Sequence, residues 1–193
     1  MREEDLLRLR WIADPRISPE GQRVVFTLVT VDIETDAYRT ELWLAQVPAS
    51  GAALTAPRAL TTTGLDSQAR WSPDGSQLAF IRKADPEADA QLYVLPMSGG
   101  EARAITSLRT GVSSPAWSPD GARIAFLSGH DPARDKPEAK KPKNAPARIV
   151  THPEFRWNGD GFVDPEHLDH LWVVAAEGGE PHRLTLGDRF KES

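Results

Sequence analysis

Few side chains of this sequence are placed for chemistry. It contains no cysteine, which excludes disulfides, thiolate metal sites and a cysteine nucleophile. It also lacks a Gly-x-Ser-x-Gly motif, in which the serine acts as nucleophile. Ser128 is followed by His130 and Asp131, but a catalytic triad is assembled in space and not by adjacency in the sequence. We therefore interpret Ser128 as part of a polar turn that leaves a strand, and we expect no catalytic residue in this chain.

The closest pair of histidines is His167 and His170. Their i, i+3 spacing suits a helix, but His170 directly precedes Leu171–Trp172, which we predict to lie in a strand. A zinc site needs further ligands, and none stands at a characteristic spacing. We expect no metal and no other cofactor.

Arg156, Asn158 and Asp160 are the best candidates for a binding site. They stand among three aromatic residues, Phe155, Trp157 and Phe162, which surround the Asn-Gly-Asp-Gly sequence at Asn158–Gly161, and this pattern predicts an ordered hairpin or lid. Insertions in repeat proteins often form the binding face. We therefore predict that these three residues contact a ligand; the alternative is a polar hairpin tip.

An internal repeat of three copies organises the whole chain. Each copy has a Ser-Pro-Asp-Gly or Ser-Pro-Glu-Gly signature, an apolar run, a Leu-aromatic pair and an aliphatic-Thr pair, always in this order. The signature serines are Ser18, Ser72 and Ser118, and this spacing is close to the roughly 40–50 residues of a four-stranded propeller blade. The Leu-aromatic pairs are Leu42–Trp43, Leu92–Tyr93 and Leu171–Trp172, and the aliphatic-Thr pairs are Leu60–Thr61, Ile105–Thr106 and Leu184–Thr185.

The physical properties of these landmarks predict an all-β fold. Proline fixes φ for a turn, aspartate caps it and glycine accepts a positive φ, so each signature predicts a tight reversal between strands. In the following run, Ile124 and Phe126 alternate with Ala125 and Leu127, so both faces of the strand are apolar and must be covered. We predict a partial β-propeller of about three four-stranded antiparallel blades with a short N-terminal helix, at Glu3–Arg10.

The repeat also predicts the boundaries of the blades. The third copy is stretched by an insertion at about 129–168, whose Lys-, Pro- and Ala-rich part at Asp131–Ala147 we interpret as a flexible surface loop. A fourth signature is expected just after Ser193, so we interpret the chain as part of a longer array that lacks its catalytic domain. The predicted segments are an N-terminal helix and lead-in at 1–16, blade 1 at 17–66, blade 2 at 67–112 and blade 3 at 113–193.

Composition excludes several classes of partner. The net charge is −5, which gives no electrostatic footprint for nucleic acid. The chain has no apolar stretch long enough to span a membrane and no apolar core of a secretion signal at its start. We expect a cytoplasmic protein with neither nucleic acid nor membrane as a partner.

The repeat carries a family resemblance. The Trp-Ser-Pro-Asp-Gly signatures, the Leu-Trp pairs and the Gly-Gly-Glu-x-x-Arg-Leu-Thr sequence resemble the propeller of the prolyl oligopeptidase (S9) family of serine peptidases. TolB-type propellers share this repeat. The opening segment Asp5–Pro15 and the insertion Phe155–Phe162 are similar to the acylaminoacyl-peptidase branch.

The resemblance implies a non-catalytic propeller that works with a C-terminal α/β-hydrolase domain, which is missing here. It would gate and help to bind short or N-acylated peptides, with Arg156, Asn158 and Asp160 as contacts in the substrate channel. The alternative is a stand-alone TolB-like module for protein–protein interaction. Because three blades leave two apolar sheet faces uncovered, we also expect self-association.

Overall fold

The computed structural model describes residues 8–49, 53, 55–129, 156–157, 161–162 and 169–185, and β-strands are the regular secondary structure of this part of the chain. Among these residues, no helix has the length and apolar character needed to cross a membrane.

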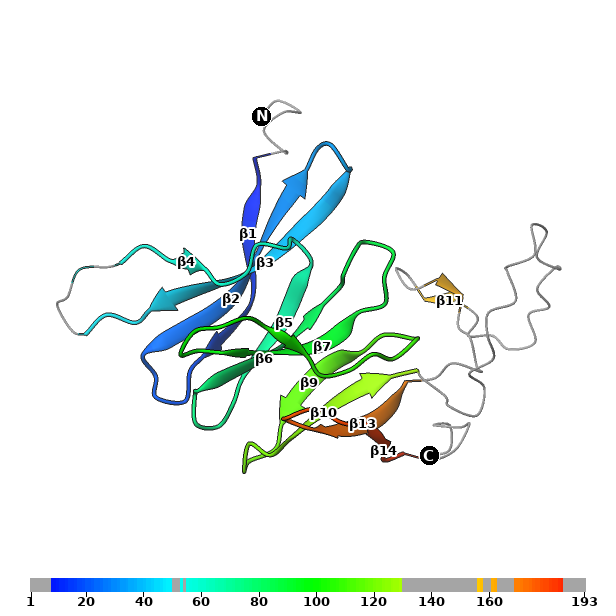
Figure 1. Cartoon of the computed structure of the whole chain (residues 1–193). Coiled ribbons are helices and arrows are strands. Elements are labelled where there is room, and N and C mark those ends of the chain that lie inside the picture. Colours follow the sequence, from blue (N-terminus) through cyan, green and yellow to red (C-terminus); the bar gives the residue numbers. More distant parts are fainter. Residues whose placement is uncertain are drawn as a thin grey trace.

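Three four-stranded antiparallel sheets correspond to the three sequence repeats, and we call them blades 1, 2 and 3 (Figure 1). The predicted all-β fold with three four-stranded sheets is therefore confirmed. Blade 1 consists of β1 (Arg10–Ile17), β2 (Arg23–Asp32), β3 (Ala37–Gln46) and β4 (Arg58–Ala59). Blade 2 consists of β5 (Asp66–Trp71), β6 (Gln77–Arg82), β7 (Gln91–Pro96) and β8 (Arg103–Ala104). Blade 3 consists of β9 (Ser113–Trp117), β10 (Arg123–Ser128), β13 (His170–Ala175) and β14 (His182–Arg183).

The N-terminal helix is not seen in the described residues. Arg8 lies in a turn, Leu9 has no regular structure and Arg10 begins β1, while the rest of the predicted helix lies outside the described part. A strand begins at Arg10 because β1 pairs with β2 along most of its length. Part of the segment predicted as a lead-in is thus the innermost strand of blade 1.

Each signature forms the predicted turn between the first two strands of its blade. In blade 2 the Gly75 N–H donates to the Ser72 carbonyl at 2.9 Å, and Gly75 has a φ of +70°. The Ser72 Oγ accepts the N–H of Gln77 at 2.9 Å, so the serine also fixes the start of the next strand. The equivalent contacts recur in blades 1 and 3.

The aliphatic-Thr pair joins the outer edge of each blade to its third strand. In blade 2 the Thr106 Oγ1 accepts the N–H of Leu92 at 3.0 Å, and the Ile105 N–H donates to the Leu92 carbonyl at 2.7 Å. The same two contacts join Leu171 to Thr185 and Leu184, and Leu42 to Thr61 and Leu60. The Leu-aromatic pair and the aliphatic-Thr pair therefore occur together in each repeat because they hydrogen-bond to each other.

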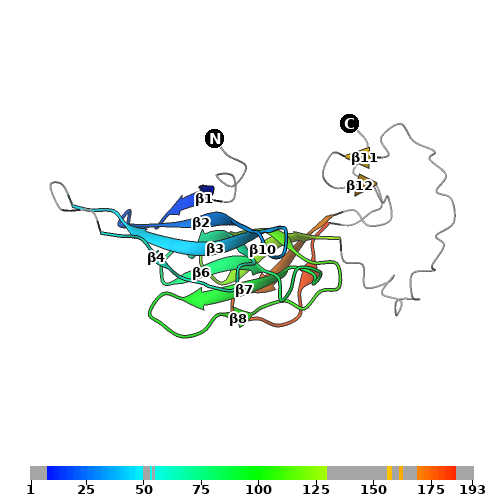
Figure 2. The same cartoon turned by 90° about the horizontal axis from the view of Figure 1, so that it is seen from above.

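The blades stack face to face in chain order (Figure 2), and β5 contacts both β1 and β9. The central strand β6 is buried on both faces, as predicted for these apolar runs. Leu78 and Phe80 pack toward blade 1, whereas Ala79 and Ile81 pack toward blade 3. The core is thus divided into two layers, one between each pair of neighbouring blades.

Candidate functional site

One of the three predicted binding residues, Arg156, lies in a pair of strands outside the three blades. β11 (Arg156–Trp157) pairs antiparallel with β12 (Gly161–Phe162), which confirms the hairpin pairing predicted for this insertion (Figure 1). Arg156 therefore lies in β11, whereas Asn158 and Asp160 lie outside the described residues. Contact of these three residues with a ligand stays a prediction.

Ser128 and His170 lie opposite each other on β10 and β13, but hydrogen bonds within the fold hold both side chains. The Ser128 Oγ donates to the Gly111 carbonyl at 2.6 Å, and the Ser128 side chain is buried. The His170 Nδ1 is 3.3 Å from the Thr185 Oγ1. The interpretation of Ser128 as a structural residue at the end of a strand is supported by these contacts. His167 lies outside the described residues.

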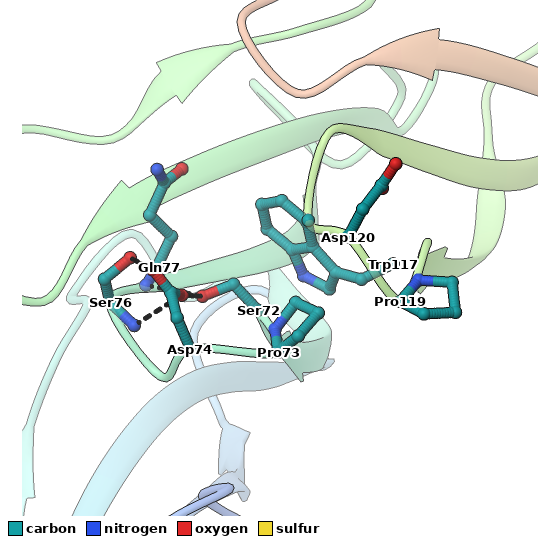
Figure 3. A pocket seen from close by; sticks show the side chains of 9 residues that line it. Ser72, Pro73, Asp74, Ser76, Gln77, Trp117, Pro119 and Asp120 are labelled. Carbon is teal, nitrogen blue, oxygen red and sulfur yellow. Dashed lines mark hydrogen bonds between the residues drawn. The ribbon is translucent and has the colours of Figure 1, made fainter.

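Between the signature turns of blades 2 and 3 lies a pocket of about 350 Å³ (Figure 3). Asp74 is on its wall and accepts hydrogen bonds from the Ser72 Oγ at 2.6 Å and from the N–H and Oγ of Ser76 at 3.0 and 2.7 Å. These bonds lower the pKa of Asp74 to about 2. The pKa of Asp120 is lowered by the same kind of contact with Ser118. Both carboxylates stay ionised to support their turns, as predicted, and are unsuited to general acid–base catalysis near neutral pH.

The signature tryptophans connect neighbouring blades. The Trp71 Nε1 donates to the Arg16 carbonyl of blade 1, and the Trp117 Nε1 donates to the Arg70 carbonyl of blade 2, both at 3.0 Å. The equivalent residue of blade 1 is Ile17, which is 62% exposed and has no such donor. The tryptophan contact thus sets the register between a blade and the preceding one. Ile17 of blade 1 cannot make this contact.

A charged cluster links the first strands of blades 1 and 2. The two carboxylate oxygens of Asp14 contact different arginines, Arg16 Nη2 and Arg70 Nη1, each at 2.6 Å. Asp14 is at an irregularity of β1 and has a φ of +47°, and the equivalent residues Gln68 and Ser114 have φ values of +55° and +53°. Such bulges redirect side chains and are common near functional sites.

The ends of the same strands line a groove of about 570 Å³ across all three blades. Its wall repeats the same four positions in each blade, namely the residue two before the signature serine, the Trp or Ile, the serine and the proline. These residues are Arg16–Pro19, Arg70–Pro73 and Ala116–Pro119. Sequence analysis missed this groove, although the fixed position of Arg16 and Arg70 relative to the signature serines was a signal that could have identified it.

The two ends of the blade stack differ in their loops. The signature turns are equally long in all blades, at 18–22, 72–76 and 118–122. At the opposite end, the connections between the second and third strands grow from 33–36 to 83–90 and then to 129–169. A second pocket, of about 280 Å³, lies at this end between blades 2 and 3, and Leu127 and Asp169 on its wall flank the insertion. We call this end the insertion face.

The comparisons with known proteins agree with this architecture. The family model of the TolB beta propeller domain matches residues 10–155. The curated protein "Uncharacterized peptidase YuxL" of Bacillus subtilis (strain 168) is 35% identical over 113 residues, which are 58% of this chain and 16% of that protein. This chain therefore spans only a small part of the length of that relative.

Solved structures show the same fold at low sequence identity. The acylaminoacyl peptidase of Pyrococcus horikoshii superposes with a TM-score of 0.66 at 17% identity, over 93% of this chain and 26% of that chain. The β-propeller domain of the Trilobed protease of Pyrococcus furiosus gives 0.57 at 15% identity, over 92% of this chain and 44% of that chain. The putative TolB of Agrobacterium tumefaciens gives 0.53 at 16% identity, over 89% and 49%.

The chain therefore resembles the propeller portion of peptidases of the acylaminoacyl-peptidase type. Its repeats, its three stacked blades and the match of the family model over most of its length show that it belongs to the TolB β-propeller domain family.

Proposed function

We propose that these blades are the propeller portion of a serine peptidase and that they control the access of short or N-acylated peptides to a separate α/β-hydrolase domain. The observation that carries this proposal is the growth of the connection between the second and third strands from blade 1 to blade 3, while the signature turns at the other end keep one length. In repeat proteins, insertions that gather on one face often form the binding surface. The similarity to YuxL, named a peptidase, and to acylaminoacyl peptidases supports peptides as the proposed substrate class of that surface.

The described residues offer a scaffold for this role. Ser128 and His170 are engaged within blade 3, and Asp74 is engaged in a turn. In the proposed enzyme, the hydrolytic step belongs to the separate α/β-hydrolase domain. The part of the propeller would be to restrict the size of peptides that reach it.

An active-site-directed fluorophosphonate, which reacts with an activated serine, tests this proposal. We expect it to label the protein encoded by the complete gene and to leave the purified 193-residue chain unlabelled. The complete protein should also hydrolyse an N-acetyl-alanine anilide, and alanine at the labelled serine should abolish both signals. Hydrolysis by the 193-residue chain alone, or a complete protein that neither reacts nor hydrolyses, would contradict the proposal.

A second candidate function is that of a protein-interaction module, because the fold is also similar to the putative TolB of Agrobacterium tumefaciens. Under this alternative, the complete gene would encode a closed ring of blades without a Gly-x-Ser-x-Gly motif. Its product would not react with the fluorophosphonate. The same labelling experiment therefore separates the two functions.

A further inference from the structure

The charged side chains that line the groove at the ends of β1, β5 and β9 are all positive. Arg16 and Arg70 are the charged side chains among the residues that line it. Their side chains are 47% and 26% exposed, so both reach solvent. A ligand in the groove would therefore meet positive charge.

Asp14 neutralises only part of this charge. Its one carboxylate bridges the two guanidinium groups, through Arg16 Nη2 and Arg70 Nη1, each at 2.6 Å. A guanidinium has five N–H donors arranged in a planar fork, so these contacts use a fraction of the donors of each arginine; Arg70 Nη1 also donates to the Ala69 carbonyl. Two cations and one anion leave a net positive charge, and the bridge holds both cations in place.

The rest of the groove is suited to a peptide chain. Trp71 and Trp117 contribute aromatic surface, and their Nε1 donors are already engaged by backbone carbonyls. The three signature prolines, Pro19, Pro73 and Pro119, add apolar surface beside them. Aromatic and apolar walls with a few convergent polar groups are typical of ligand sites.

We propose that this groove binds the carboxylate of a peptide, with Arg16 and Arg70 as the carboxylate-binding residues and Asp14 as an internal carboxylate with which the ligand competes. Arginine pairs with carboxylates through parallel N–H···O bonds, and these charge-assisted bonds are stronger than neutral ones. The proposal rests on the proposed function for its ligand class, since it takes peptides as the molecules that these blades meet. It adds a charge preference at the end of the stack opposite the insertion face.

Isothermal titration of the 193-residue chain with three matched peptides tests this site directly. The peptides are N-acetyl-trialanine as the free acid, the same peptide as the C-terminal amide, and N-acetyl-Ala-Glu-Ala amide. We expect the free acid to bind at least about five-fold more tightly than the neutral amide, and this difference to shrink at high salt. Binding of the glutamate peptide would extend the site to side-chain carboxylates, whereas its failure to bind would restrict the site to C-terminal ones.

Substitutions of opposite expected sign make the test specific. Arg16→Gln and Arg70→Gln should each weaken binding of the free acid by roughly three- to ten-fold. Asp14→Asn should strengthen it by roughly two- to five-fold, because it removes the competing carboxylate and asparagine tolerates the positive φ of this position. Arg58→Gln makes the same charge change on the exposed β4 edge strand and should leave binding unchanged.

Circular dichroism and the unfolding midpoint establish that each variant is folded, and Arg16→Gln, at the more exposed of the two arginines, decides the result if Arg70→Gln does not fold. Equal binding of the acid and the neutral amide, unaffected by Arg16→Gln, would overturn the carboxylate site while leaving peptide binding by the blades intact. If no peptide binds, the inference is wrong, and the fluorophosphonate experiment still decides the proposed function separately.

Discussion

At the scale of single residues, small hydroxyl side chains hold the repeat together. The signature serines fix both sides of each turn, and the threonines of the outer edge accept a backbone N–H from the third strand. Each contact provides an acceptor for a backbone N–H that the regular β-ladder leaves unpaired. A buried N–H without an acceptor would destabilise the fold. The repeat therefore depends on polar atoms at fixed positions as well as on its apolar runs.

Thr61→Val tests this role because valine keeps the β-branched shape and removes the oxygen. Thr61 is buried, and its Oγ1 accepts the N–H of the fully buried Leu42 at 3.0 Å. We expect the free energy of unfolding in urea to fall by about 1–3 kcal/mol, because the N–H loses its acceptor. Thr62→Val changes an exposed neighbour and should stay within about 0.5 kcal/mol of the wild type. Equal effects of the two substitutions would contradict the role of the Thr61 hydroxyl.

Asp74 makes the stability of the signature turn depend on pH. Its pKa is lowered to about 2 in the folded chain by hydrogen bonds from Ser72 and Ser76. Because the folded pKa lies below the unfolded one, the stabilisation is complete above about pH 4 and is lost as the pH falls toward 2. The thermal unfolding midpoint of the Asp74→Asn variant should therefore fall less between pH 5 and pH 2 than that of the wild type. Parallel midpoint curves for the two proteins would show that this carboxylate does not contribute.

At the scale of elements, each blade is stabilised by contacts with its neighbours that an isolated blade could not make. The Trp71 and Trp117 side chains each donate to a carbonyl of the preceding blade, and β6 is buried between two layers of core. Each blade thus covers an apolar face of its neighbour and fixes its register. Neighbour contacts of this kind make the stability of repeat proteins depend on the interfaces between repeats.

Trp71→Phe removes the indole donor between blades 1 and 2 while it keeps an aromatic ring. We expect a loss of about 1–2 kcal/mol in the free energy of unfolding, because the Arg16 carbonyl loses its partner and the smaller ring leaves space. Trp11→Phe is the matched control, since Trp11 is partly exposed on blade 1 and pairs edge-on with Tyr38. A smaller loss for Trp71→Phe than for Trp11→Phe would argue against a contact that sets the register.

At the scale of the whole molecule, the stack of three blades has two outer faces. Ile12 and Ile17 of blade 1 are more than half exposed, and their ladder partners Leu28 and Val24 lie on the face turned away from blade 2. In blade 3, Leu171 and its partner Leu127 lie on the corresponding outer face. Both are sheet faces of the same repeat type, so a second copy offers each of them a complementary surface.

We propose that the 193-residue chain associates with itself through these two faces. Light scattering at micromolar concentration should give a mass above that of one chain, and Ile17→Lys or Leu171→Lys should shift it toward the monomer. A charged side chain in a desolvated interface lacks a partner, which disfavours association. Thr62→Lys, at an exposed residue of the connection between β4 and β5, is the control. A wild-type chain that stays monomeric would show that the exposed faces do not associate.

The sequence by itself determined the repeat, the signature turns and the strands that are apolar on both faces. It could do so because turn chemistry and alternation are local properties, visible in Pro73, Asp74 and Gly75. The N-terminal helix was the exception, because pairing with β2 gives a strand from Arg10 onward.

Only the tertiary structure decided which side chains from different blades meet. Asp14 and Arg70 lie far apart in the sequence and are joined because β1 and β5 are neighbours and a positive φ redirects the carboxylate. Which carbonyl accepts the hydrogen bond of the Trp71 Nε1 likewise depends on how the two blades stack. Contacts between repeats arise from packing over long sequence separations, so the repeat pattern identifies the blades while their stacking creates the groove.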